Sequence, residues 1–246
     1  MDIRSRGKLA AYLKLLSRHR GEAAGAYDEV AAFYDDFARV WDQQITAPAL
    51  RHVNHLIEER VKPGALVLDA GAGTGERTLA LLEHSQPGKV IALDASAAML
   101  DVARSKIHDP RVSFIQGDVR HLPIADNTFD VVVCTWVIEI MEDPRAVVQE
   151  FIQVIKPAGV VIYAFCSLPE RPPGTLLKYV MAKVSSKEGQ LTHLLPEEEQ
   201  PFHRCEYSSL TRFVGGLTTV ATVGKCCTVT DAFVACRVRE PEVVVK

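Results

Sequence analysis

Apolar residues along the middle of the chain form short continuous runs, separated by segments in which they recur every three or four positions. The runs occupy 65–70, 89–94, 112–116, 129–135 and 159–165. Such Val-, Ile- and Leu-rich runs are typical of strands buried on both faces, as in a parallel sheet. Helical spacing occupies 75–84, 96–107 and 143–155, with Ser96 as an expected N-cap. The alternation predicts an α/β fold with helices on both faces of the sheet.

The two ends of the chain follow other patterns. Apolar residues keep a helical period over 26–44, whereas 1–25 predicts a separate basic amphipathic helix, whose first twenty residues have six Lys/Arg against one acid, Asp2. Such a helix can lie on an anionic membrane surface, can dock on the domain with its basic face in water, or can be an organellar targeting segment. The first alternative predicts peripheral membrane contact through residues 1–20.

The C-terminal third predicts how the sheet ends. Residues 207–216 resemble a helix with a glycine stop, and 217–229 and 231–238 predict two strands. Strands so close in sequence must pair in antiparallel fashion. We therefore expect a Rossmann-like, mostly parallel seven-stranded sheet with an antiparallel last strand, in one domain over 26–246. A proline-rich insert at about 167–206 predicts a cap over the substrate.

Candidate chemistry gathers where the predicted strands end. The first run leads into Asp69 and the turn Gly71-Ala72-Gly73, the second ends at Asp94, and the third leads into Asp118. In an open parallel sheet these ends share one edge, where ligands bind. Three carboxylates would repel a pyrophosphate, and Glu76 stands where a dinucleotide-binding turn has its third glycine.

The carboxylates suit a nucleoside that carries positive charge. Asp94 is placed to accept from two ribose hydroxyls and Asp118 from an adenine amine, while Met99 and Val119 offer apolar contacts to the ring. Asp69 is placed near the turn to help hold an ammonium group. S-adenosylmethionine has all of these groups.

Four segments carry a family resemblance: LVLDAGAGTG (66–75), ALDAS..ML (92–100), QGDVRHLPIADNTFDVVV (116–133) and KPAGVVIYAF (156–165). They resemble the class I S-adenosylmethionine-dependent methyltransferases, above all the small-molecule group with the ubiquinone- and menaquinone-biosynthesis C-methyltransferases. Tyr27, Ala31, Tyr34 and Asp35 match that group's pattern over the cofactor.

The resemblance implies a transferase that moves a methyl group from S-adenosyl-L-methionine to a small-molecule or lipid-like acceptor, leaving S-adenosyl-L-homocysteine. The cofactor-binding residues expected from the motifs are Tyr34, Asp69, Gly71, Ala72, Gly73, Asp94, Ala95, Met99, Asp118, Val119 and Thr135. The aromatic candidates Tyr27, Tyr34 and Trp136 can face the cofactor or belong to the core.

The catalytic group is left open. Many small-molecule methyltransferases have a histidine shortly after the fourth strand, but this chain has Glu139 in that region. A base is needed only where the acceptor must lose a proton. Glu139, His193 and His203 are the candidates, and an exposed surface position is the alternative for the histidines.

Composition narrows the alternatives. The net charge of -3 gives no support for a nucleic-acid partner, and no metal site is expected. Six cysteines without a C-x-x-C spacing favour a reducing, cytoplasmic setting. Alternatives to the leading function are methylation of a phospholipid headgroup amine at the membrane surface, methylation of a thiolate-bound metalloid held by the C-terminal cysteines, an NAD-dependent oxidoreductase, and a cofactor-binding protein without catalysis.

Overall fold

The computed structural model describes residues 27–176, 194–201 and 208–225. The basic segment 1–25, the candidates His193 and His203, and the cysteines beyond Cys166 lie outside these ranges, so the expectations for them stay predictions.

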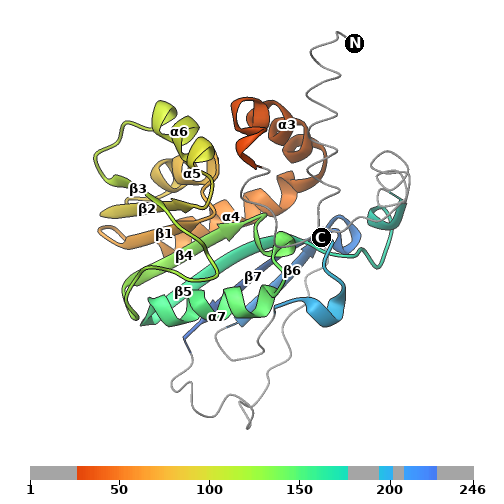
Figure 1. Ribbon diagram of the computed structural model, residues 1–246. Coiled ribbons are helices and arrows are strands. Elements are labelled where there is room, and N and C mark those ends of the chain that lie inside the picture. The colour runs from red at the N-terminus through yellow and green to blue at the C-terminus, as the bar shows by residue number, and fades with distance from the viewer. Residues whose placement is uncertain (1–26, 177–193, 202–207, 226–246) are drawn as a thin grey trace.

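A seven-stranded sheet forms the centre of the molecule, in the order β3-β2-β1-β4-β5-β7-β6 (Figure 1). The strands are β1 Leu66–Ala70, β2 Lys89–Asp94, β3 Val112–Gln116, β4 Phe129–Thr135, β5 Ile155–Cys166, β6 Ser208–Phe213 and β7 Thr218–Gly224. All neighbours pair in parallel except β7, which is antiparallel to both β5 and β6. The predicted mostly parallel seven-stranded sheet with an antiparallel last strand in chain order is confirmed, with β7 as that strand in the described ranges, whereas the predicted strand 231–238 lies outside them.

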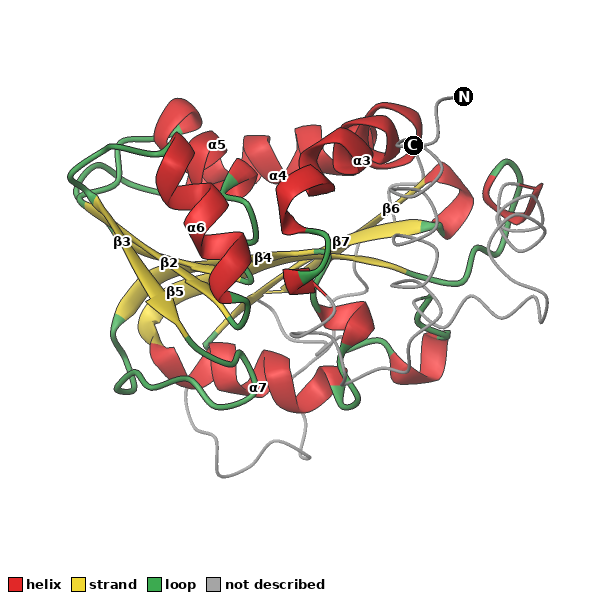
Figure 2. Cartoon of the chain, turned by 45° about the horizontal axis from the view of Figure 1, so that its top comes forward, coloured by secondary structure: helices red, strands yellow, loops and turns green. Residues whose placement is uncertain are grey.

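Helices cover both faces of the sheet, with α4, α5 and α6 on one side and α7 on the other (Figure 2). The α-helices are α3 Tyr34–Trp41, α4 Ala47–Arg60, α5 Glu76–His84, α6 Ala97–Lys106 and α7 Pro144–Val154. Short elements are the 3-10 turns η1 Ala31–Phe33, η3 Ile138–Ile140, η4 Glu197–Glu199 and η5 Val214–Gly216, and the π-helix η2 Asp42–Thr46.

Helix caps explain where two of these helices begin. Ser96 caps α6 as predicted, because its hydroxyl accepts the Met99 N–H at 3.1 Å. Asp143 does the same for α7, accepting from the N–H groups of Arg145 and Ala146. The sequence pattern did not single out α4.

One part of the C-terminal prediction is wrong. Residues 208–213 form β6, an edge strand, instead of a helix. Leu210 and Phe213, three positions apart, are both buried as a helical stripe would be. Pairing with β7, as in Leu210 opposite Ala221, overrides that local pattern.

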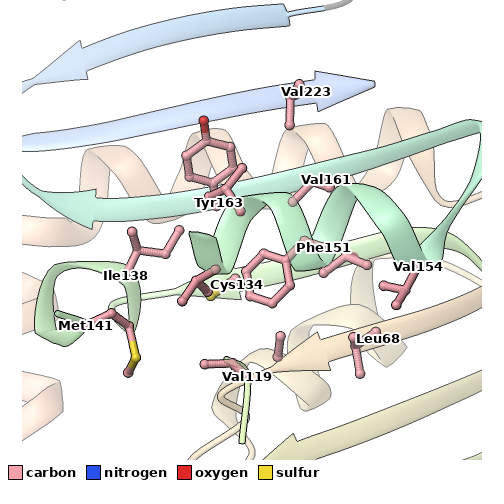
Figure 3. Packing of buried hydrophobic residues seen from close by; sticks show 14 of the residues in the cluster. Leu68, Val119, Cys134, Ile138, Met141, Phe151, Val154, Val161, Tyr163 and Val223 are labelled. Carbon is pink, nitrogen blue, oxygen red and sulfur yellow. The ribbon is translucent and has the colours of Figure 1, made fainter. Parts of the chain in front are cut away.

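The core divides between the two faces of the sheet because side chains alternate along each strand. Leu68, Cys134, Val161 and Tyr163 point toward α7, where Phe151 and Val154 cover them (Figure 3). The neighbouring positions on the strands pack on the other face against α4 and α5. Because both faces of the sheet are packed, the carboxyl ends of β1 to β4 are held in place along one edge of the sheet.

Candidate functional site

The glycine turn after β1 brings the backbone close to two other elements. Gly71, Gly73 and Gly75 all have positive φ, which favours glycine. A Cβ on Gly71 would lie 2.2 Å from Val137 Cγ2, and one on Gly75 would lie 2.7 Å from Ile107 Cδ1. Beside Gly73 the same position is open, which leaves room for a ligand next to the turn.

A cavity follows the ends of β1, β2 and β4 and the loop after β3, at the point where strand order reverses. Its lining residues are Tyr27, Tyr34, Gly71, Gly73, Asp94, Ala95, Met99, Gly117, Asp118, Val119, Arg120, Thr135, Trp136, Val137, Ile140 and Met141. We call it the donor pocket. It brings together every predicted cofactor residue except Asp69 and Ala72.

Asp94 holds the turn and borders the pocket at once. Its Oδ2 accepts the Gly73 N–H and its Oδ1 accepts the Ser96 N–H, each at 2.8 Å. The Ala95 N–H also bonds to Asp94, and because an ionised carboxylate has about four acceptor positions, acceptor capacity still remains for a ribose. Burial raises the pKa of Asp94, and the hydrogen bonds from these backbone N–H groups lower it.

Asp118 has a partner that the sequence analysis did not foresee. The Arg120 guanidinium donates to both carboxylate oxygens, from Nη2 at 2.6 Å and from Nε at 2.9 and 3.0 Å. This hydrogen bonding lowers the pKa of Asp118 and keeps it ionised. Both residues line the donor pocket, so a purine amine would meet an Asp–Arg pair.

Asp69 lies deeper than predicted. It is 1% exposed and, in the part of the chain that the structure describes, lines neither the donor pocket nor the cavity beside it. Thr78 Oγ1 donates to Asp69 Oδ2 at 2.5 Å, while Oδ1 has no hydrogen-bond partner within the described ranges. Burial raises its pKa to about 6.

A second cavity, the acceptor cavity, adjoins the donor pocket. It shares Tyr27, Tyr34, Gly71, Gly73, Thr135, Trp136 and Ile140 with that pocket. Its other lining residues are Phe37, Ala38, Trp41, Asp42, Leu50, Ala72, Thr74, Glu76, Arg77, Glu139, Cys166 and Leu194. Ala72 and Glu139 are thus placed here, and Leu194 comes from the predicted insert.

The N-terminal elements are fastened over the glycine turn. Thr74 Oγ1 donates to Asp35 Oδ1 at 2.5 Å, and Lys106 Nζ donates to Asp35 Oδ2 at 2.8 Å. Ser96 Oγ donates to Asp28 at 2.5 Å. Tyr34 is thereby held against both cavities, and burial, then Asp42 and Glu139, raises its pKa.

Arg77 is a charged residue of the acceptor cavity that sequence reasoning missed. Its Nη1 donates to Asn54 Oδ1 at 2.5 Å, but its Nε has no partner within the described ranges. Burial lowers the pKa of Arg77, and the nearby Asp69 and Asp42 oppose this. The only sequence signal was its position two residues after the turn.

The open donor on Arg77, the open oxygen on Asp69 and the space beside Gly73 fit an amino-acid-bearing nucleoside such as S-adenosylmethionine. Among the described residues, no group of three or more His, Cys, Asp and Glu could hold a metal ion. No helix in the same ranges is long and apolar enough to span a membrane.

Comparison with known proteins shows the family of this chain. The family described as "Methyltransferase domain" matches residues 68–163. A demethylmenaquinone methyltransferase from Lactiplantibacillus plantarum is 31% identical over 165 residues, which cover 64% of this chain and 68% of that protein. The chain belongs to the S-adenosylmethionine-dependent methyltransferases. This membership removes the support for an NAD-dependent oxidoreductase.

Two further relatives differ in what they methylate. A demethylmenaquinone methyltransferase from Renibacterium salmoninarum is 34% identical, over 59% of this chain and 62% of its own length. A malonyl-[acyl-carrier protein] O-methyltransferase from Xylella fastidiosa is 30% identical, over 72% of this chain and 56% of its own length. The matches therefore span about half to two thirds of these relatives.

A solved structure supports the fold of this methyltransferase. A structure from Methanococcus maripaludis, described as "a putative s-adenosyl-l-methionine-dependent methyltransferase", has a TM-score of 0.55 with 20% identity. The likeness covers 82% of this chain and 95% of that one.

Proposed function

We propose that this chain transfers a methyl group from S-adenosylmethionine to a small, largely apolar aromatic molecule that carries a hydroxyl group. The observation that carries this proposal is the acceptor cavity, which adjoins the donor pocket and combines aromatic walls with the buried Glu139 and the half-buried Asp42. A flat apolar ring can pack against Trp41 and Trp136, and a hydroxyl can donate to a carboxylate.

S-adenosylmethionine, when bound, supplies a methyl group on a positively charged sulfur. In this proposal Asp94 accepts from the two ribose hydroxyls, and Met99 and Val119 contact the purine. Arg77 pairs with the carboxylate of the amino-acid part, and Asp69 attracts its ammonium group from beneath the turn. Each of these residues borders the donor pocket, the acceptor cavity or the turn between them.

The protein contributes mainly by alignment, because this methyl donor is already activated. Holding the acceptor atom in line with the methyl group and sulfur removes much of the entropic barrier. Tyr27, Tyr34 and Trp136 line both cavities, so they separate the reacting groups from water at their junction. Their ring faces also attract a positive sulfur.

The cavity favours one kind of acceptor over the other kind found among the relatives. Malonyl carries a carboxylate, whereas the acceptor cavity is bordered by Asp42 and Glu139, and Arg77 is assigned to the donor. An anionic acceptor would therefore meet like charges in a site with little water. An uncharged ring such as that of reduced demethylmenaquinone avoids this repulsion.

The test measures transfer of labelled methyl from S-adenosylmethionine, comparing reduced demethylmenaquinone with malonyl-acyl carrier protein. We expect product only with the reduced quinone. Transfer to malonyl-acyl carrier protein alone would overturn the acceptor class. Thermal denaturation with S-adenosylhomocysteine or NAD tests the donor separately. Stabilisation by NAD alone would overturn the donor assignment.

A further inference from the structure

We propose that Glu139 is the general base of this methyltransferase and takes the proton from the hydroxyl group of the acceptor. This proposal rests on the proposed function, since it needs an acceptor whose hydroxyl must be deprotonated. It also names a carboxylate, rather than either histidine candidate, as the group that makes the acceptor nucleophilic.

The fold fixes where the Glu139 carboxylate lies. Glu139 is the middle residue of η3, directly after β4, and it is 4% exposed. Its Oε1 accepts the Cys166 N–H at 3.2 Å. Cys166 ends β5, which pairs in parallel with β4, so the carboxylate is bonded to the sheet edge where ligands bind.

The neighbours of Glu139 in η3 show that packing alone does not require an acid there. Ile138 and Ile140 belong to the core cluster, and Ile138 lies near Cys134 in the apolar layer between sheet and α7 (Figure 3). An ionised carboxylate in such surroundings loses much of its hydration, which is energetically unfavourable. An acid kept at a cavity wall under these conditions is a candidate for chemistry.

Glu139 also lies at the junction of the two cavities. Thr135 and Trp136 before it and Ile140 after it line both the donor pocket and the acceptor cavity, while Glu139 itself lines the acceptor cavity. An acceptor hydroxyl next to Glu139 therefore lies close to the donor pocket. This is the position that a base for methyl transfer must occupy.

Several titratable groups surround the carboxylate. Burial raises the pKa of Tyr27, Tyr34, Cys134 and Cys166, and the charge of Glu139 raises each of them further. These four groups are thus kept neutral beside it. The proton acceptor in this group is the carboxylate, because the phenols and thiols around it hold their own protons.

The step balances as follows in atoms and charge. The acceptor O–H bond breaks, and its proton forms an O–H bond with the Glu139 carboxylate. The electron pair left on the acceptor increases electron density on the oxygen and on the conjugated ring carbons. Either the oxygen or one of these carbons then bonds to the methyl carbon. The electron pair of the broken carbon–sulfur bond stays on sulfur, giving S-adenosylhomocysteine. If a ring carbon is methylated, the acceptor oxygen becomes a carbonyl. The methylated carbon then loses its hydrogen as a proton to water, and the oxygen takes its proton back from Glu139, which restores the aromatic hydroxyl and the carboxylate.

The test compares the wild-type chain with Glu139→Gln, which keeps the size of the side chain and loses the base. With 1,4-dihydroxynaphthalene as probe, we expect kcat to fall by about 100- to 10,000-fold. The Kd for S-adenosylhomocysteine should change less than about threefold. Glu142→Gln, an exposed acid three residues later, is the matched control and should keep wild-type kcat. A Glu139→Gln enzyme within threefold of wild-type kcat would overturn the proposal.

A second readout distinguishes chemistry from structural damage. In a series of naphthols with decreasing hydroxyl pKa, the ratio of wild-type to Glu139→Gln rates should shrink, because an acidic hydroxyl needs less help. A constant ratio would show a structural role and overturn the proposal. A further variant, Glu139→Asp, covers the case in which Glu139→Gln folds poorly. Because Glu139→Asp keeps a carboxylate, it should retain more activity than Glu139→Gln. Failure of the wild type to methylate any hydroxyarene would instead overturn the proposed function, and this proposal with it.

Discussion

The donor pocket and the acceptor cavity adjoin one another but are assembled in different ways. Apart from Tyr27 and Tyr34, the donor pocket comes from the ends of β1, β2 and β4, the loop after β3, and residues just beyond them. The acceptor cavity adds α3, η2, the end of β5 and Leu194 from the insert. In the proposed function, the shared sheet edge binds the donor, and α3, η2 and Leu194 select the acceptor.

The largest effect on this comparison is expected at Asp94. Asp94→Ala removes the acceptor of two ribose hydroxyls and the bond to Gly73 N–H. Hydrogen bonds to a charged group contribute about 1.5–3 kcal/mol each, so affinity for S-adenosylhomocysteine should fall by at least about 100-fold. Calorimetry measures this.

The control for that experiment is Asp101→Ala, which removes an exposed carboxylate from α6 that pairs with Arg104. It should bind like the wild type. Equal affinity of Asp94→Ala and Asp101→Ala would place the nucleoside elsewhere.

Two glycines of one turn should differ in what they damage. Gly71→Ala drives a methyl group into Val137 at a positive φ, so unfolding free energy should fall by about 2–5 kcal/mol. Gly73→Ala meets open space and should cost about 1–2 kcal/mol from its φ alone, while weakening S-adenosylhomocysteine binding. Chemical denaturation and calorimetry separate the two. Equal loss of stability in both variants would contradict the described packing.

The acceptor cavity can be perturbed without the donor pocket. Trp41 lines the former and not the latter, and it stacks on Phe37 with centroids 6.3 Å apart. Trp41→Ala should raise KM for reduced demethylmenaquinone about tenfold through lost aromatic contact. The Kd of S-adenosylhomocysteine should stay within about twofold. A change in Kd as large as that in KM would show that the two cavities act as one.

The smallest expected effect is the pH dependence of ligand affinity that arises from Asp69, beneath the glycine turn. Because the pKa of Asp69 is about 6, its carboxylate is mostly ionised above pH 6 and mostly neutral below it. Affinity for S-adenosylhomocysteine should therefore fall a few-fold as pH drops through 6, since attraction to the ammonium group is lost. Adenosine, which has no ammonium group, should show no such change.

Asp69→Asn should remove the pH dependence for S-adenosylhomocysteine as well. The same raised pKa means that the ligand-free wild type loses stability as pH rises from about 4 to about 6, because the folded state holds the proton more tightly. Asp69→Asn should lack this component. If Asp69→Asn keeps the wild-type pH profile of binding, Asp69 does not interact with the ammonium group of the ligand.

The sequence predicted the donor pocket better than the acceptor cavity for a physical reason. Three strands, 89–94, 112–116 and 129–135, have the predicted bounds, because continuous Val/Ile/Leu runs buried on both faces have few alternatives. Once those strands are placed, Asp94 and Asp118 must share an edge of the sheet.

The remaining residues depend on tertiary contacts without a local signal. Trp41 and Leu194 lie far apart in the chain and meet only because α3 and the insert close over the same edge. Asp69 was predicted to stand near the turn, but Thr78 binds it beneath the sheet edge. The apolar spacing of β6 is typical of a helix, and only its pairing with β7 makes this segment a strand.

The most direct test of the account is a crystal structure with S-adenosylhomocysteine and a hydroxynaphthalene bound together. The account predicts both ribose hydroxyls on Asp94 and the sulfur at the junction formed by Tyr34 and Trp136. The hydroxyl of the acceptor should lie within hydrogen-bond distance of Glu139. A sulfur facing away from the acceptor cavity, or an acceptor bound outside it, would contradict the account.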